Sequence, residues 1–312
     1  MTVNLRIHMI SALACLPLMA CNNDIFVEDS SPSQNEVEIE GDGGTCSIEI
    51  KTKALKDIYV SSGDSYNTQT TYYDRQGNPL EDNYTITELG SINYSSMWVL
   101  LDVDIDGNRL TIRSTENSSR TEQNIYISLD YGHVVENIKV NMLPGKPMET
   151  EYLIFAENHL NVTPISKIES TAQSMHNNTS ITQRIEFHPY LEKEGIALLD
   201  HENPQINSLE VKTSLPTYIN GRWIMDDGEQ HAMSLGQSHR YFPKGLQRDL
   251  TVSVEVAPYT NLRAVCGVEY SSITVPFFAS FINPVSGRTF LETGVCTVSE
   301  PVGYRIHTEE YE

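Results

Sequence analysis

Short runs in which hydrophobic and polar residues alternate make up most of the chain. In the clearest run, Leu250, Val252, Val254 and Val256 alternate with polar residues, and Ile125, Ile127 and Leu129 repeat the pattern. Successive side chains of a strand point to opposite faces, so this alternation predicts half-buried β-strands. The one stretch that favours a short helix is 165–175. The sequence therefore predicts a mainly β protein.

A linker interrupts the alternating runs near the middle of the chain. Residues 46–145 contain short alternating runs separated by turn residues such as Asp106-Gly107-Asn108, which is typical of an immunoglobulin-like β-sandwich. Pro144-Gly145-Lys146-Pro147 then forms a compact linker, because proline ends a strand and glycine lets the chain redirect. Residues 148–312 return to alternating runs and predict a second antiparallel β domain.

The first 45 residues predict export and anchoring. Residues 1–20 carry Arg6 and an apolar run from Met9 to Ala20, which fits a signal peptide and is too short to span a bilayer. Leu18-Met19-Ala20-Cys21 has the form of a lipobox, in which Cys21 is lipidated; an ordinary secretory signal or an uncleaved anchor is the alternative. Residues 21–45 are acidic without Lys or Arg, which predicts a flexible tether.

Three resemblances accompany these patterns. Asn22-Asn23-Asp24 resembles the lead sequence of surface-exposed Bacteroidota lipoproteins, which implies a lipid-anchored protein on the outer face of the outer membrane. Ser96 to Val99, Gly107 to Ile112 and Ile138-Lys139-Val140 resemble BACON-type modules, although Met142-Leu143-Pro144 departs from their usual final strand. Such modules serve as spacers or as carbohydrate contacts.

The second domain resembles the aerolysin and ε-toxin family of pore-forming proteins. The motifs that carry the resemblance are Asn177 to Ser180, Thr251 to Thr260, Ile273 to Phe277 and Ser286-Gly287. The resemblance implies an elongated antiparallel β domain with a hairpin that enters membranes, for which 207–241 is the candidate. Pro216 and a charged tip make insertion costly there, so a long surface loop and binding without vesicle leakage are favoured.

Net charge and motif content limit the functions and ligands that we expect for this chain. The formal net charge of −21 argues against nucleic-acid binding, which needs clustered Lys or Arg. The chain has none of the short catalytic or phosphate-binding motifs, and its histidines are scattered, so we expect no enzyme activity, no cofactor and no metal. Asp102, Asp104 and Asp106 begin like a calcium loop, but Arg113 occupies the position that requires Glu, which favours a solvated acidic turn.

Cysteines and aromatic residues supply the remaining candidates. Cys266 and Cys296 fall in strand-like stretches of one domain and are a candidate disulfide, with two buried free thiols as the alternative. Trp98 is expected in the core. Four aromatic residues around the 207–241 segment are candidates for stacking on sugar rings, and Trp223 is expected to be exposed. They are Trp223, Tyr218, Tyr241 and Phe242.

Together these observations favour a lipid-anchored surface protein with a non-catalytic binding or oligomerising β module. The expected partners are the membrane that holds its lipid, a cell-surface glycan or target membrane, and further copies of the chain. The alternative is a glycan-binding accessory lipoprotein for polysaccharide capture.

Replacing Cys21 with serine tests the anchor. The acidic chain offers no basic patch to hold it at anionic lipid, so Cys21→Ser should move the protein from the membrane pellet to the soluble fraction. Fractionation followed by immunoblotting measures this, with Cys46→Ser as the matched control. Continued pelleting of the Cys21 variant would contradict the lipobox assignment.

Overall fold

The computed structural model describes residues 31–63, 68–81, 84–156, 161–207, 209–225 and 228–311. The signal peptide, Cys21 and the first ten tether residues lie outside this set. The described chain is mainly β, as predicted, and its only helices are two 3-10 turns of three residues each. No described helix is long and apolar enough to cross a membrane.

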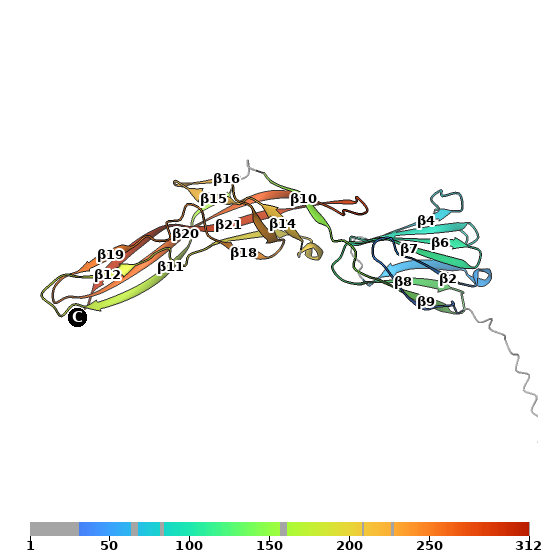
Figure 1. Ribbon diagram of the computed structural model, residues 1–312, viewed down its shortest axis with the longest axis horizontal. Helices are drawn as coiled ribbons and strands as arrows, with labels where there is room; N and C mark the ends of the chain where they lie inside the picture. Colours follow the sequence, from blue (N-terminus) through green and yellow to red (C-terminus); the bar gives the residue numbers. More distant parts are fainter. Residues whose placement is uncertain are drawn as a thin grey trace, which may run out of the picture.

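The first domain is a sandwich of two sheets (Figure 1). One sheet has the order β1(Glu36–Ile39), β9(Val135–Met142), β8(Gln123–Asp130), β3(Asp57–Ser62). The other has the order β2(Thr45–Glu49), β7(Arg109–Asn117), β6(Val99–Asp106), β5(Leu89–Ser95), β4(Gln69–Asp74). Ile58, Ile92, Leu101 and Ile127, from strands of both sheets, are fully buried in the shared core. The alternation seen in the sequence thus directs one face of each sheet inward.

The predicted tether is wrong for its last ten residues. Residues 36–39 form β1, which pairs in parallel with β9 from Glu36↔Lys139 to Ile39↔Met142. Val37 and Ile39 alternate with glutamates and are buried in the core. Two buried aliphatic side chains and a strand ladder outweigh the acidic composition here.

Two long strands form the axis of the second domain. β20(Asn261–Ile282) and β21(Thr289–Glu310) have 22 residues each and pair from end to end. β10(Glu149–Phe155) and β11(Asn161–His176) flank β20, whereas β13(Gly195–His201) and then β18(Ser238–Tyr241) flank β21. Figure 1 shows the resulting elongated shape. The domain is the elongated antiparallel module that the sequence analysis expected.

The two halves of the second domain have separate cores along this axis, and a smaller third cluster of Tyr190, Val268 and Tyr270 lies on the far half. In the half next to the first domain, Val275, Phe277 and Val298 pack beneath the segment that follows β13. In the far half, β12(Gln183–Phe187) pairs with β19(Val252–Val256), and the pair covers Leu262, Ala264 and Cys266. Apolar residues of β20 therefore contribute to the cores of both halves.

The predicted helix over 165–175 is wrong, because these residues belong to β11. Lys167 to His176 pair with Tyr270 to Asn261 without interruption. The long partner strand supplies hydrogen bonds that local helical spacing does not reveal.

The segment 207–241 is also not the long surface loop that was favoured. It folds as two nested strand pairs, β14(Glu210–Thr213) with β17(His231–Ser234) and β15(Pro216–Ile219) with β16(Arg222–Met225). The inner turn uses Asn220 and Gly221, whose φ values are 52° and 82°. Positive φ at both positions is the type I′ hairpin geometry that Asn-Gly favours.

A buried asparagine ends one strand in each domain with the same contacts. The Nδ2 of Asn117 donates to the carbonyls of Met142 and Leu143, at 3.0 and 2.9 Å. The Nδ2 of Asn177 donates to those of Val256 and Ala257, at 3.0 and 2.9 Å. The side-chain oxygen of each asparagine accepts a hydrogen bond from the backbone N–H of the residue two positions later in the chain. One amide therefore satisfies backbone groups that a strand end leaves unpaired.

The two domains are joined by more than the predicted linker. Arg288, in the turn between β20 and β21, donates to the carbonyls of Ser96 and Met97 and to Glu116, the last at 2.7 Å. Glu116 is fully buried and also accepts from the Ser286 hydroxyl at 2.6 Å. The Met97 side chain is buried in the core of the second domain, and Trp98, expected in a core, is partly buried against both cores.

Replacing Asn177 with alanine should lower the free energy of unfolding of the second domain by about 2 to 3 kcal/mol, because buried carbonyls lose their donors. Denaturant titration measures the change. The adjacent Asn178 is exposed and provides the control, with an expected effect of Asn178→Ala below about 0.5 kcal/mol. Equal effects at the two positions would contradict the role assigned to Asn177.

Candidate functional site

A buried carboxylate holds the nested hairpin against the long sheet. Glu300 lies on β21 and is 1% exposed. Its carboxylate accepts hydrogen bonds from the Tyr218 N–H at 2.8 Å, the Thr217 hydroxyl at 3.2 Å and the Tyr241 hydroxyl at 2.6 Å. Burial raises the pKa of Glu300 despite these donors. Burial first, and then the Glu300 charge, raise the pKa of Tyr241.

Two of the four predicted aromatic binding residues are buried, and one of them, Tyr241, contacts Glu300. Trp223 and Tyr241 are each 9% exposed, so the expected exposure of Trp223 is wrong. The Trp223 indole donates to the Ser271 hydroxyl at 3.0 Å. The hairpin folds as a layer over β20 and β21, which turns alternate side chains of β16 inward. Neither ring presents a free face for a sugar.

The other two aromatic residues are more accessible but lie in different surroundings. Tyr218 is half-buried and meets Trp223 edge to face at 5.7 Å between ring centroids. Phe242 is 45% exposed, and the Arg248 guanidinium covers its ring at 3.8 Å from the centroid. The four aromatic residues therefore do not form a shared sugar platform.

The predicted Cys266 to Cys296 disulfide is wrong, because both thiols are free and buried. Cys266 pairs with Ile306 and Cys296 pairs with Val275, so nine residues of β20 separate the two positions. At the rise of a strand this is about 30 Å, far beyond the reach of a disulfide. Burial raises the pKa of the Cys296 thiol to about 12.

The acidic residues that resemble a calcium loop lie along strand β6. Asp104 forms an ion pair with Arg113, and Asp102 accepts from the Asn93 amide at 2.7 Å. Asp106 is exposed where β6 ends. Within the described residues no group of three His, Cys, Asp or Glu side chains is placed to hold a metal ion.

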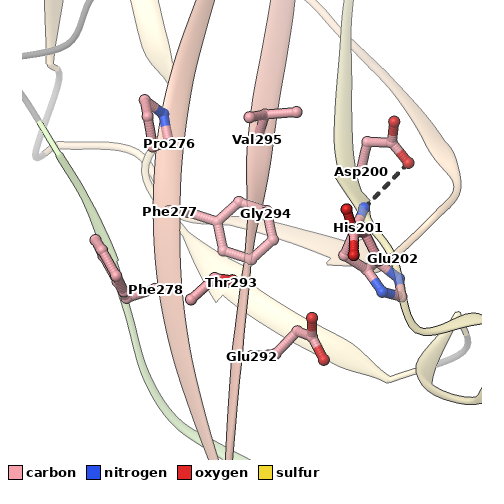
Figure 2. A pocket seen from close by; sticks show the side chains of 10 residues that line it. All are labelled: Asp200, His201, Glu202, Pro276, Phe277, Phe278, Glu292, Thr293, Gly294 and Val295. Atoms are coloured by element: carbon pink, nitrogen blue, oxygen red, sulfur yellow. Dashed lines mark hydrogen bonds between the residues drawn. The ribbon is translucent and has the colours of Figure 1, made fainter.

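A cavity of about 650 Å³ opens where β13 separates from β21 (Figure 2). Asp200, His201 and Glu202 line one side, and Glu292 lies on β21 across from them. The rest of the lining comes from β20 and β21, namely Pro276, Phe277, Phe278, Thr293, Gly294 and Val295. The lining contains three carboxylates and no Lys or Arg. Sequence reasoning missed this site because its parts come from three separate strands.

The far half of the second domain has a different exposed feature. Its sheet consists of β11, β20 and β21 only, with Lys167 to His176 on one edge and Pro301 to Glu310 on the other. In the described part of the chain neither outer edge has a strand partner. Both edges therefore present about ten residues of backbone to solvent.

Comparisons with known proteins give similarities of fold. No protein-family model matches the sequence, and no curated protein matches it either. Similar solved structures include a lamprey immune protein, with 12% identity, a TM-score of 0.39 and coverage of 82% of this chain and 99% of that one. An aerolysin-like protein of Bombina maxima has 11% identity, a TM-score of 0.29 and coverage of 52% and 98%. A putative pore-forming toxin of Bacteroides vulgatus has 9% identity, a TM-score of 0.17 and coverage of 91% and 92%.

The Glu300 contact predicts how stability depends on pH. A carboxyl whose pKa is raised on folding binds its proton more tightly in the folded state, so its contribution to stability is greatest below its unfolded pKa. This contribution is lost as pH rises through the raised value. We expect hydrogen exchange of residues 210–241 to quicken with rising pH beyond the intrinsic rate change, and Glu300→Gln to remove that excess. The exposed Glu255→Gln is the control, and an unchanged excess in Glu300→Gln would contradict the assignment.

Proposed function

We propose that this chain is a lipid-anchored, non-catalytic cell-surface protein whose second domain associates edge to edge with further copies of itself. The observation that carries the proposal is the pair of free strand edges on the far half of the second domain. An unpaired edge is a template for another strand, and proteins that remain monomeric usually block it.

The strand directions determine how copies would meet. β11 and β21 each run antiparallel to β20, so they run parallel to one another. A neighbour in the same orientation would place its β11 beside the β21 of the first copy. This contact joins two different surfaces, and its repetition gives a ring or a filament.

Several of the charges near the edges are paired within one copy. Glu169 accepts from Lys167 at 2.5 Å and from Lys193 at 2.7 Å, and these contacts lower the pKa of its carboxyl to about 2. Arg305 pairs with Glu269 on the neighbouring strand. Internal pairing leaves less charge to repel an approaching strand.

Anchoring at Cys21 would assist association. Lipid-anchored copies share one plane and one orientation, which raises their effective concentration. The first domain would serve as the spacer that its BACON-like motifs imply. Its contacts through Arg288 would carry the second domain as a unit.

The geometry supports association more strongly than membrane entry or glycan capture. Each strand of the nested hairpin has four residues, whereas a strand that spans a membrane needs about 9 to 11. Glu300 also holds the hairpin in place. Glycan capture is less well supported because two of its four candidate binding residues, Trp223 and Tyr241, are buried. We therefore expect binding or association without leakage of vesicles.

Lysine substitutions on β11 test the association. Ser170 and Ala172 are exposed and two positions apart, so Ser170→Lys with Ala172→Lys places two charges on one face of the edge. Sedimentation velocity of the Cys21→Ser protein over a wide concentration range should show self-association. The lysine pair should weaken that self-association about tenfold, since inserted lysines are a common block to strand pairing.

The matched control places the same charges on β3, an edge strand of the first domain. Tyr59 and Ser61 are both exposed there, and Tyr59→Lys with Ser61→Lys should leave association unchanged. A protein that stays monomeric at every concentration, and also when anchored on vesicles, would refute the proposal. Release of a trapped dye would instead indicate membrane entry.

A further inference from the structure

The fork between β13 and β21 leaves a second stretch of backbone unpaired. β13 pairs with β21 from Ile196↔Ser299 to His201↔Gly294 and then turns away. On this side, Thr289 to Thr293 of β21 have no strand partner among the described residues, although their other side pairs with β20. The cavity of Figure 2 lies beside this free edge, so there is space where a strand would continue.

The aspartate and glutamate side chains that line the fork make it negatively charged. Asp200, Glu202 and Glu292 line the cavity, and its lining contains no Lys or Arg. Both ring nitrogens of His201 are shielded from solvent and have no hydrogen-bond partner in the described part of the chain. A ligand with positive charge and N–H donors would satisfy the three carboxylates.

The outer face of the same strands carries exposed apolar side chains, two of which, Phe278 and Val295, also line the cavity. Leu291 is 68% exposed and Val295 39%, and they alternate with Glu292 and Gly294 along β21. Phe278 is 49% exposed and lies directly across from Ile154, which is 56% exposed. Exposed apolar side chains that cluster on one sheet face mark an interaction surface.

We propose that the fork binds an extended, positively charged peptide segment as an added strand on Thr289 to Thr293. Alternate side chains of an added strand point to opposite faces. Asp200 pairs with Val295 and so shares the outer face with Leu291 and Phe278, whereas Glu292 points to the other face. An added strand would therefore meet a carboxylate on each face, where Lys or Arg would pair with it, and its apolar side chains would cover Leu291 and Phe278. Backbone hydrogen bonds would hold the strand, and the carboxylates would select its charge.

The chemistry of the fork favours this partner over others. A second copy of the chain would bring a formal charge of −21 to a site that already holds three carboxylates. A metal ion is disfavoured because, within the described residues, the carboxylates are not grouped as ligands. The inference does not depend on self-association, since that involves the far half of the domain.

The test uses the mature chain with Cys21→Ser and a fluorescent peptide of four Lys-Val repeats with blocked ends. Fluorescence anisotropy should show binding at least about tenfold tighter than for four Glu-Val repeats, because the charge at the fork selects cations. The Lys-Val peptide methylated on alternate backbone nitrogens keeps its charge but loses strand donors. The methylated peptide should bind at least about tenfold more weakly than the unmethylated Lys-Val peptide.

Variants separate the fork from the general negative charge of the protein. Glu202→Gln with Glu292→Gln should weaken binding of the Lys-Val peptide about tenfold. Glu49→Gln with Asp106→Asn removes equal charge from exposed positions of the first domain and should change affinity less than about twofold. Equal loss in both double variants, equal binding of the methylated peptide, or no binding of the Lys-Val peptide would overturn the proposal.

Discussion

The ladder between β20 and β21 is the interaction on which the second domain depends. Its paired strands of 22 residues each extend through two separate cores and connect at one end to the first domain through Arg288. β10, β11, β13 and β18 join this pair in one sheet, and three separate two-stranded sheets accompany it. Because the pair is much longer than its flanking strands, stretches of its edges remain unpaired. The fork and the Pro301 to Glu310 edge follow from that mismatch of length, and the other far edge is the outer side of β11.

Buried polar side chains fix the places where hydrophobic packing alone would leave the structure undefined. Asn117 and Asn177 satisfy the carbonyls at strand ends, Glu116 joins the domains, and Glu300 holds the nested hairpin. Each of them is almost completely buried and has several partners. Removing one partner would leave the others unsatisfied in a poorly solvated site, which is why such contacts specify geometry strongly.

Both inferred surfaces are unpaired strand edges, but each edge suits a different partner. Several charges on the far edges are already paired within one copy, which suits another copy of the same chain. The fork carries three carboxylates without a cation in its lining, which suits a basic strand. Charge at the edge, rather than the edge itself, would therefore select the partner.

The sequence by itself determined the mainly β class, because alternation is a local property that each strand displays on its own residues. A boundary near Pro144 and lipidation at Cys21 stay predictions from the sequence. Only the tertiary structure decided which strands pair, and pairing determined burial. It buried Trp223 and Tyr241, separated Cys266 from Cys296 by nine positions, and brought β1 into the first domain. These outcomes depend on partners far away in sequence, whose register no local pattern encodes.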